Sequence, residues 1–124
     1  MRRAWRLRAN DDFQRVRREG RSWAHPLLVL VVAPGRDPDG ATRVGITVSR
    51  RVGNAVVRNR VKRRVRETMR LRYPDLARGW DLVFVVRPYA ARASFDRLGE
   101  AIEGLLGRAD LQTGALPCVG SPSS

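Results

Sequence analysis

The stretch RVGITVSRRVGNAVVRNRVKRRVRETMRLRY (residues 43–73) decides the fold of this chain. Its first part alternates apolar and polar side chains, a pattern that predicts a strand over 43–49. Asn54 then provides a good N-cap, and neither Gly nor Pro follows until Pro74, so we expect a helix over 55–72. The stretch therefore predicts a strand that passes through a short turn into a long helix.

The predicted helix has two faces of opposite character. At about 100° per residue, its apolar side chains fall within roughly a 120° arc, which we expect to face the core; they are Val57, Val61, Val65 and Met69. The opposite arc is polar and almost entirely basic; it consists of Asn59, Lys62, Arg63, Arg66 and Arg70, with Arg58 and Arg60 at its edges.

A basic face of one sign favours phosphate binding over simple solvation. Solvated helix faces usually mix charges in i,i+4 pairs, whereas Glu67 is the only acid in this helix. Arg50 and Arg51 precede the helix N-terminus, where free N–H groups and the helix dipole also favour an anion. A solvated face remains the alternative. A membrane-surface helix is the weaker one, because valines replace the bulky apolar residues that such helices carry.

The flanking sequence predicts two further helices and two further strands. A helix over 10–19 places Phe13, Val16 and Arg17 on one side. Strands are expected over 27–33 and 81–87, and a second helix over 94–108, capped by Ser94. The apolar stripe of that last helix is predicted to be Phe95, Leu98, Ile102, Leu105 and Leu106.

The composition indicates one small domain with a polyanionic partner. The chain has 124 residues, 43% of them hydrophobic, a net charge of +13 and a pI near 11.7. Residues 43–72 alone hold eleven basic side chains and one acidic one. Nucleic acid is the leading partner and an anionic membrane surface the second. A DNA-binding helix-turn-helix is disfavoured, because a predicted strand, not a helix, precedes the basic helix.

The sequence shows little catalytic or metal-binding chemistry. Its one cysteine, Cys118, excludes a disulfide framework, and its one histidine, His25, is expected at a strand edge or on the surface. Helix capping is a sufficient role for the pair Asp11 and Asp12. The longest apolar run, Leu27–Ala33, is too short to span a bilayer, and no secretory signal is evident, so we expect a cytoplasmic protein.

The block RVGITVSRRVGNAVVRNRVKRRVR (43–66) resembles the bacterial ribonuclease P protein subunit, whose members share VG-x-x-VS-[KR]-[KR]-[VI]-GNAV-x-RN-R-x-KR-x-x-R. NDDFQRVRREG (10–20) is similar to the family's first helix, and DLVFVVRPYA (81–90) to its last strand. The resemblance covers about residues 5–108.

The resemblance implies an α+β fold. Its expected order is α-β-β-β-α-β-α, with a four-stranded sheet and a left-handed strand–helix–strand crossover like that of a ribosomal-protein domain. This order requires a short additional strand near 21–24. The expected organisation is an RNA-binding domain over 1–110 and a flexible tail over 111–124.

The resemblance also implies that the catalyst is a partner RNA, which removes the 5′ leader of precursor tRNA. The protein would bind that RNA and the leader, with Mg²⁺ held mainly by RNA, and would supply no catalytic residue or metal ligand. No membrane and no obligate protein partner are expected. The RNA-binding residues that match the family motif are Arg58, Asn59, Arg60, Lys62, Arg63 and Arg66; Arg50, Arg51 and Arg70 join them from the charge pattern.

Phe13 matches an aromatic residue of the family's leader-binding cleft; the alternative is a purely structural role in the core. Arg17 and Val31 stand where some members carry aromatics, so stacking of the leader at these two positions departs from the family pattern, although an arginine can also stack on a base. Two alternative functions remain: a non-catalytic RNA-binding or ribosome-associated module of the same fold, and a protein-only nuclease.

Overall fold

A computed structural model describes residues 6–7 and 10–111 of the chain. The elements are α1 (Asn10–Glu19), β1 (Arg21–Ala24), β2 (Leu28–Pro34), β3 (Arg43–Val48), α2 (Ala55–Arg72), β4 (Trp80–Val86) and α3 (Phe95–Arg108), with short 3₁₀ turns η2 (Arg50–Val52), η3 (Tyr73–Asp75) and η4 (Pro88–Arg92). Apart from the 3₁₀ turns, the elements follow the order α-β-β-β-α-β-α. Cys118 and the predicted tail beyond Leu111 lie outside the described residues.

The four strands form one mixed sheet in the order β1-β2-β4-β3. β1 pairs with β2 and β2 with β4 in antiparallel fashion, whereas β3 and β4 are parallel, from Arg43 opposite Asp81 to Val48 opposite Val86. Parallel neighbours need a crossover connection, and α2 provides it. The left-handedness of this crossover stays a prediction from the resemblance.

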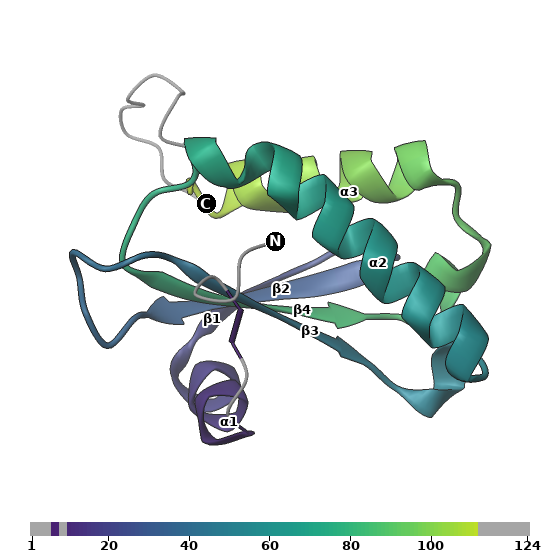
Figure 1. Cartoon of the computed structure of the whole chain (residues 1–124), viewed down its shortest axis with the longest axis horizontal. Coiled ribbons are helices and arrows are strands. Elements are labelled where there is room, and N and C mark those ends of the chain that lie inside the picture. Colours follow the sequence, from purple (N-terminus) through teal and green to yellow (C-terminus); the bar gives the residue numbers. More distant parts are fainter. Residues whose placement is uncertain (1–5, 8–9, 112–124) are drawn as a thin grey trace.

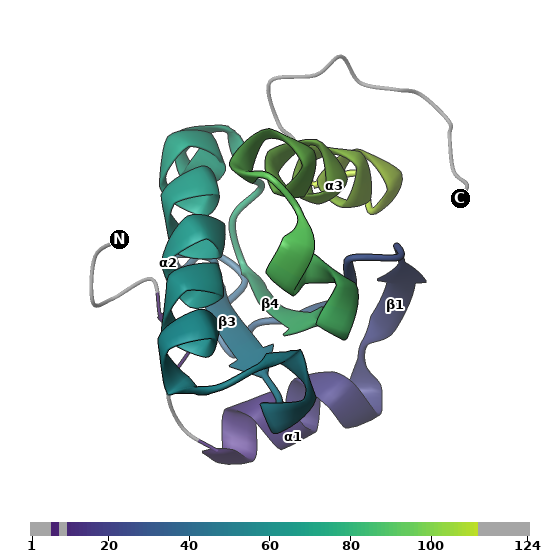
Figure 2. The same ribbon diagram turned by 90° about the vertical axis from the view of Figure 1, so that its right-hand side faces the viewer.

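The helices cover the two faces of the sheet unequally. α2 and α3 lie together on one face, and α1 lies on the other (Figures 1 and 2). The larger core fills the space beneath α2 and α3, and its fully buried side chains include Leu28, Leu30, Phe84, Leu98 and Ile102. A smaller core lies between α1 and the sheet; it consists of Leu7, Val16, Val31, Ala33 and Val83.

Local signals set the helix boundaries. Oδ1 of Asn54 accepts a hydrogen bond from the N–H of Val57 at 3.0 Å, and Oγ of Ser94 accepts one from the N–H of Arg97 at 3.1 Å. Both are the N-caps that the sequence predicts, and each satisfies a free N–H group of a helix's first turn. The strands differ from expectation by one residue at most at each end, as expected where pairing across the sheet, not composition, decides the ends.

The core faces of α2 and α3 follow the predicted stripes, with one correction. Val61, Val65 and Met69 are at most 1% exposed, and Val57 is half-buried. Phe95, expected in the core, is 43% exposed. It is the first residue of α3, and its side chain lies over α2 in a shallow surface groove, so the true stripe starts at Leu98. At the other end of α3, Leu111 is 3% exposed and belongs to the larger core.

Candidate nucleic-acid interface

The outer face of α2 presents a basic hollow. The hollow has a volume of about 510 Å³, and none of its described lining residues is acidic; they are Val56, Asn59, Arg60, Lys62, Arg63 and Arg66. Five of the predicted RNA-binding residues therefore lie together. Because the buried valines fix the rotation of α2, this stripe is held facing away from the core.

Arg58 and Arg70 of the predicted set lie outside the hollow. Arg58 is half-buried on α2, and its Nε has no hydrogen-bond partner in the described part of the chain. Arg70 is exposed and forms an ion pair with Glu67, with Nη2 and Oε1 2.5 Å apart. Hydrogen bonding and the charge of Arg70 lower the pKa of the Glu67 carboxyl. Arg70 thus already has a partner, whereas the arginines of the hollow have no acidic partner among the described residues.

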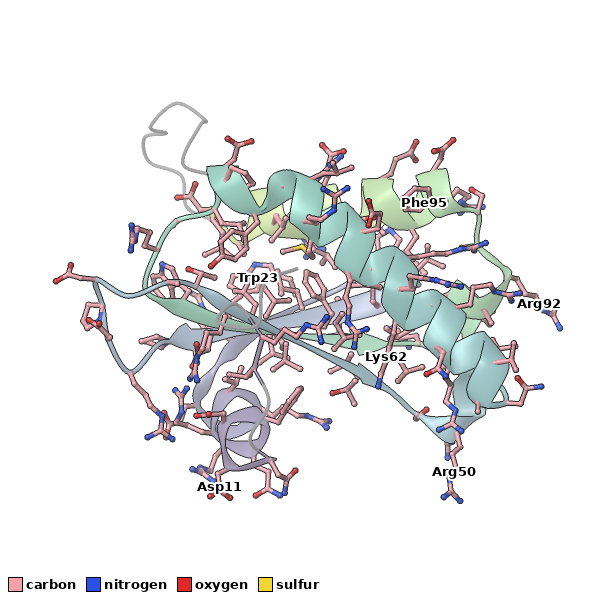
Figure 3. The ribbon with its side chains drawn as sticks, in the orientation of Figure 1. Asp11, Trp23, Arg50, Lys62, Arg92 and Phe95 are labelled. Carbon is pink, nitrogen blue, oxygen red and sulfur yellow. The ribbon has the colours of Figure 1, made fainter. Side chains whose placement is uncertain are left out.

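Arg50 and Arg51 are exposed on η2, the turn that leads from β3 into α2. This turn packs close to α2: a Cβ on Gly53 would lie 2.9 Å from Cβ of Val57, so a side chain there would force the first turn of α2 to shift. Arg50 and Arg92, from the turn after β4, both lie at the end of the molecule where α2 begins (Figure 3). Positive charge therefore continues past the helix to this end of the fold.

Phe13 lies at the junction of α1 and β3. Its ring packs on the backbone of Gly45, where a Cβ would lie 2.6 Å from Cε1 of Phe13. The ring is half-buried, so an edge of it remains accessible. Arg17 follows one turn later on α1 and is exposed, whereas Val31 is only 7% exposed beneath α1. Of the three predicted leader-binding residues, Phe13 and Arg17 therefore offer surface, and Val31 offers little.

Three half-buried residues next to α1 were missed in the sequence. Val29 faces Val85 across β2 and β4, and Val85 is level with Thr47 of the parallel strand β3. These three residues lie on the face of the sheet that α1 covers at Val31. The sequence could have predicted this position for Val29, because it is two residues before Val31 in the same strand and therefore lies on the same face.

A network of opposite charges joins α1 to the sheet. Asp81 of β4 is 1% exposed and accepts hydrogen bonds from Nε of Arg43 at 3.1 Å and from Nη2 of Arg43 at 2.8 Å. Arg15 of α1 donates to the same carboxylate and, at 3.0 Å, to the carbonyl of Pro34. Sequence reasoning missed this network, because its members are far apart in the chain.

Asp12 is the second carboxylate of the network. It also lies in the first turn of α1, where the sequence predicts a capping role. It is 6% exposed and lies near Arg43, at 3.5 Å, and Arg36, at 3.0 Å. Burial raises the pKa of its carboxyl, but the hydrogen bond from Arg36 and the charges of Arg43, Arg36 and Arg15 outweigh burial and lower it. Asp12 therefore remains ionised and anchors the helix that carries Phe13.

The histidine and the buried carboxylates of the described residues are engaged in structural contacts. His25 is half-buried, and its Nδ1 accepts a hydrogen bond from the N–H of Leu27 at 3.0 Å, a local turn contact. Over residues 6–7 and 10–111, no three His, Cys, Asp or Glu side chains cluster in a way that could hold a metal ion. Asp12 and Asp81, the two buried carboxylates among these residues, are paired with arginines.

Comparison with known proteins identifies relatives that cover most of the chain. The family model described as Ribonuclease P matches residues 1–110. The chain is similar to the ribonuclease P protein component of Roseiflexus castenholzii, with 48% identity over 94% of both chains. It is also similar to that of Chloroflexus aurantiacus, with 51% identity over 90% of this chain and 82% of the relative.

Solved structures agree with the sequence relatives. The ribonuclease P protein of Staphylococcus aureus superposes with a TM-score of 0.81 at 30% identity, covering 89% of this chain and 99% of that one. The protein from Thermotoga maritima gives a TM-score of 0.74 at 32% identity, covering 83% and 96%.

Proposed function

Because the chain belongs to the ribonuclease P protein component family, we propose that it is the protein subunit of a ribonuclease P in which RNA is the catalyst. It binds the RNA subunit and the 5′ leader of precursor tRNA. The holoenzyme cuts the precursor endonucleolytically, so that the tRNA acquires its mature 5′ end. The protein supplies binding and orientation, not a reacting group.

The observation that carries this proposal is the hollow on α2. The hollow brings together four basic side chains and the amide of Asn59, and none of its described lining residues is acidic. On the opposite side of α2, buried valines anchor the helix to the core. Arginines offer planar forks that match phosphate oxygens, and a rigid helix holds several of them in one register. Such a face suits the backbone of a folded RNA.

Leader binding is assigned to the surface between α1 and the sheet. Phe13 offers an aromatic edge, and Arg17 adds a positive charge one turn away. The half-buried row of Val29, Val85 and Thr47 continues this surface across the sheet. A single-stranded leader fits such a site, because stacking and charge bind any base sequence.

Magnesium ions are assigned mainly to RNA phosphates. This proposal is supported by the buried carboxylates of the described residues, which are paired with arginines, and by the lack of a metal-binding cluster in residues 6–7 and 10–111. A cytoplasmic location accords with this role. None of the described helices is long and apolar enough to cross a membrane.

Reconstitution tests the proposal directly. The full-length protein is mixed with the ribonuclease P RNA of the same organism and a 5′-labelled precursor tRNA in Mg²⁺. We expect cleavage at the mature 5′ end to be faster than with RNA alone, and no cleavage by protein alone. Cleavage by the protein alone would indicate a protein-only nuclease. Tighter binding to ribosomal RNA, with no stimulation of cleavage, would indicate a ribosome-associated module.

A further inference from the structure

A second, smaller hollow lies where α1, β3 and α2 meet. It has a volume of about 230 Å³ and is lined by Arg6, Leu7, Phe13, Val44, Gly45, Ile46, Lys62 and Arg66. Lys62 points from α2 toward the β3 side of the molecule (Figure 3). This hollow connects the basic face of α2 to the predicted leader cleft, because Lys62 and Arg66 also line the first hollow and Phe13 belongs to α1.

Arg6 reaches this place through backbone pairing, although it lies more than fifty residues from Lys62 in the sequence. It forms an isolated parallel bridge with Val44 at the outer edge of β3, and the N–H of Leu7 donates to the carbonyl of Val44 at 2.9 Å. Leu7 is 4% exposed in the smaller core. The backbone at Arg6 is therefore held in place before any ligand binds.

The three cations of this hollow have no counter-ion among the described residues. No side-chain hydrogen bond or ion pair joins Arg6, Lys62 or Arg66 to residues 6–7 and 10–111, and none of the eight lining residues is acidic. Within the same residues, Nε of Arg6 is buried without a hydrogen-bond partner. Burial and the nearby charge of Arg6 lower the pKa of Arg66. Holding like charges together with a buried donor unsatisfied is unfavourable unless an anion binds.

A phosphate group fits these surroundings better than a carboxylate. It has several acceptor oxygens, so it can accept hydrogen bonds from two guanidinium groups and an ammonium group at once. The remaining wall consists of Phe13, Gly45 and Ile46, with no acidic group to repel an anion. The same wall places an aromatic ring beside the phosphate position, as in a site for a nucleotide.

We propose that Arg6, Lys62 and Arg66 form a binding site for one phosphate group of RNA at the junction of the α2 face and the leader cleft. The inference rests on the proposed function, since RNA supplies the phosphate. It adds Arg6, which lies outside the arginine-rich block, to the binding residues. The phosphate comes either from the precursor's leader or from the RNA subunit, and the experiment separates these sources.

The first arm uses the isolated full-length protein and inorganic phosphate, with sodium chloride adjusted to constant ionic strength. In ¹⁵N NMR spectra, we expect the amide signals of Gly45 and Ile46 and the Nε–H signal of Arg6 to shift as phosphate is added. Arg6→Gln should abolish the response of the two amides while circular dichroism stays that of the wild type. Arg97→Gln, which removes an exposed arginine of α3, is the matched control and should keep the full response.

The second arm uses the same variants with RNA. If the leader supplies the phosphate, Arg6→Gln weakens binding of precursor tRNA to the holoenzyme by roughly tenfold and leaves mature tRNA unchanged. If the RNA subunit supplies it, assembly weakens instead, and the slope of log affinity against log salt falls by about 0.9. Either result supports the site. Arg66→Gln should weaken the same binding event as Arg6→Gln, either that of precursor tRNA or that of the RNA subunit. Agreement between the two variants would show that the effect comes from the shared phosphate site.

Two results overturn the proposal. One is an unchanged phosphate response in Arg6→Gln. The other is a lost phosphate response in Arg6→Gln together with wild-type binding of precursor tRNA and wild-type assembly with the RNA subunit, because the hollow would then bind free anions only. Failure of the proposed function is distinguishable from both: the wild-type protein would then fail to assemble with the RNA subunit, whereas the first arm would still report on the phosphate site.

Discussion

Two groups of arginines in this molecule share a side chain and differ in their surroundings. Arg15 and Arg43, between α1 and the sheet, both contact the buried carboxylate of Asp81. Arg60 and Arg63, on the outer face of α2, line a hollow that has no acid among its described residues. The first group is neutralised inside the protein, whereas the second is left for a partner outside it.

The first group of arginines should therefore contribute to stability, and the second to binding. When one partner of a buried ion pair is removed, the other charge stays buried without compensation, so the substitution should lower the free energy of unfolding. A charge on an exposed, single-sign face contributes little to stability and can even oppose it through repulsion. We therefore expect substitutions in the two regions to separate folding from RNA binding.

The largest expected effect is on stability, from Asp81→Asn. The substitution leaves Arg15 and Arg43 without their shared carboxylate, and removing one partner of a buried ion pair typically costs about 3 kcal/mol or more. Urea unfolding followed by circular dichroism measures this loss. Glu100→Gln, an exposed acid of α3, is the control and should change the free energy of unfolding little. A loss no larger than that of the control would show that the network does not hold α1 to the sheet.

A smaller loss of stability is expected on the core side of α2. Val61→Ala removes two buried methyl groups and should cost about 1–3 kcal/mol. Val56→Ala makes the same change on the same helix at a position that is 73% exposed, and should cost much less. Thermal melting compares the two. RNA binding by Val61→Ala should decline only with the fraction unfolded; lost binding at an unchanged melting temperature would mean that the two faces of α2 have been assigned the wrong way round.

Next in size is a leader-specific loss from Phe13→Ala. Stacking on an aromatic ring is worth about 1–3 kcal/mol per base, so precursor tRNA should bind the holoenzyme roughly tenfold more weakly. Mature tRNA, which lacks a leader, should bind as before. Titrations in Ca²⁺, where cleavage should be slow, measure both affinities.

Arg17→Ala supplies the companion test, because Arg17 is exposed and carries no core packing. It should repeat the leader-specific loss at unchanged stability, with a weaker dependence on salt. Equal losses for both RNAs at full protein stability would exclude a leader site on α1.

Single arginines of the α2 hollow should each have a smaller, salt-dependent effect. Arg60→Ala, Arg63→Ala and Arg66→Ala should each weaken assembly with the RNA subunit and lower the salt slope by about 0.9 per duplex phosphate contact, with unchanged circular dichroism. Arg70→Ala is the comparison within the same helix, and should act less because Glu67 already pairs with Arg70. Wild-type affinity and salt slope in the first three variants would exclude this face.

The smallest expected effect is a pH dependence of stability from Asp12. Its carboxyl pKa is lower in the folded protein than in the unfolded chain. The stabilisation is therefore fully present above the unfolded value of about 3.9 and is lost as the pH falls through the folded value. Asp12→Asn should be less stable than the wild type at neutral pH, and the gap should narrow below about pH 4. Acid titrations of both proteins by circular dichroism measure this; a constant gap would contradict the ion-paired state of Asp12.

Most of the local structure could be predicted from the sequence. α1, α2 and the two caps at Asn54 and Ser94 were expected where they occur, since periodicity and capping depend on residues a few positions apart. The two faces of α2 were predictable for the same reason. Phe95 was assigned wrongly to the core because the helical period alone does not say where along α3 the burial of its apolar stripe ends.

The short strand β1 shows the limit of local reasoning. Its four residues, RSWA, are largely exposed at the edge of the sheet and have no clear alternation, and only the family resemblance suggested it. The sheet order, in which β4 inserts between β2 and β3, likewise depends on pairing between distant segments.

The sequence by itself determined the helices, the three longer strands and the chain's large excess of positive charge, because these follow from residue type and short-range spacing. Only the tertiary structure decided which arginines are neutralised. Arg43 meets Asp81 because β3 and β4 pair in parallel, and Arg6 meets Lys62 and Arg66 because its backbone joins the edge of β3. Electrostatic partners are set by distance in space, so the paired and unpaired arginines of one sequence become distinguishable only when the chain is folded.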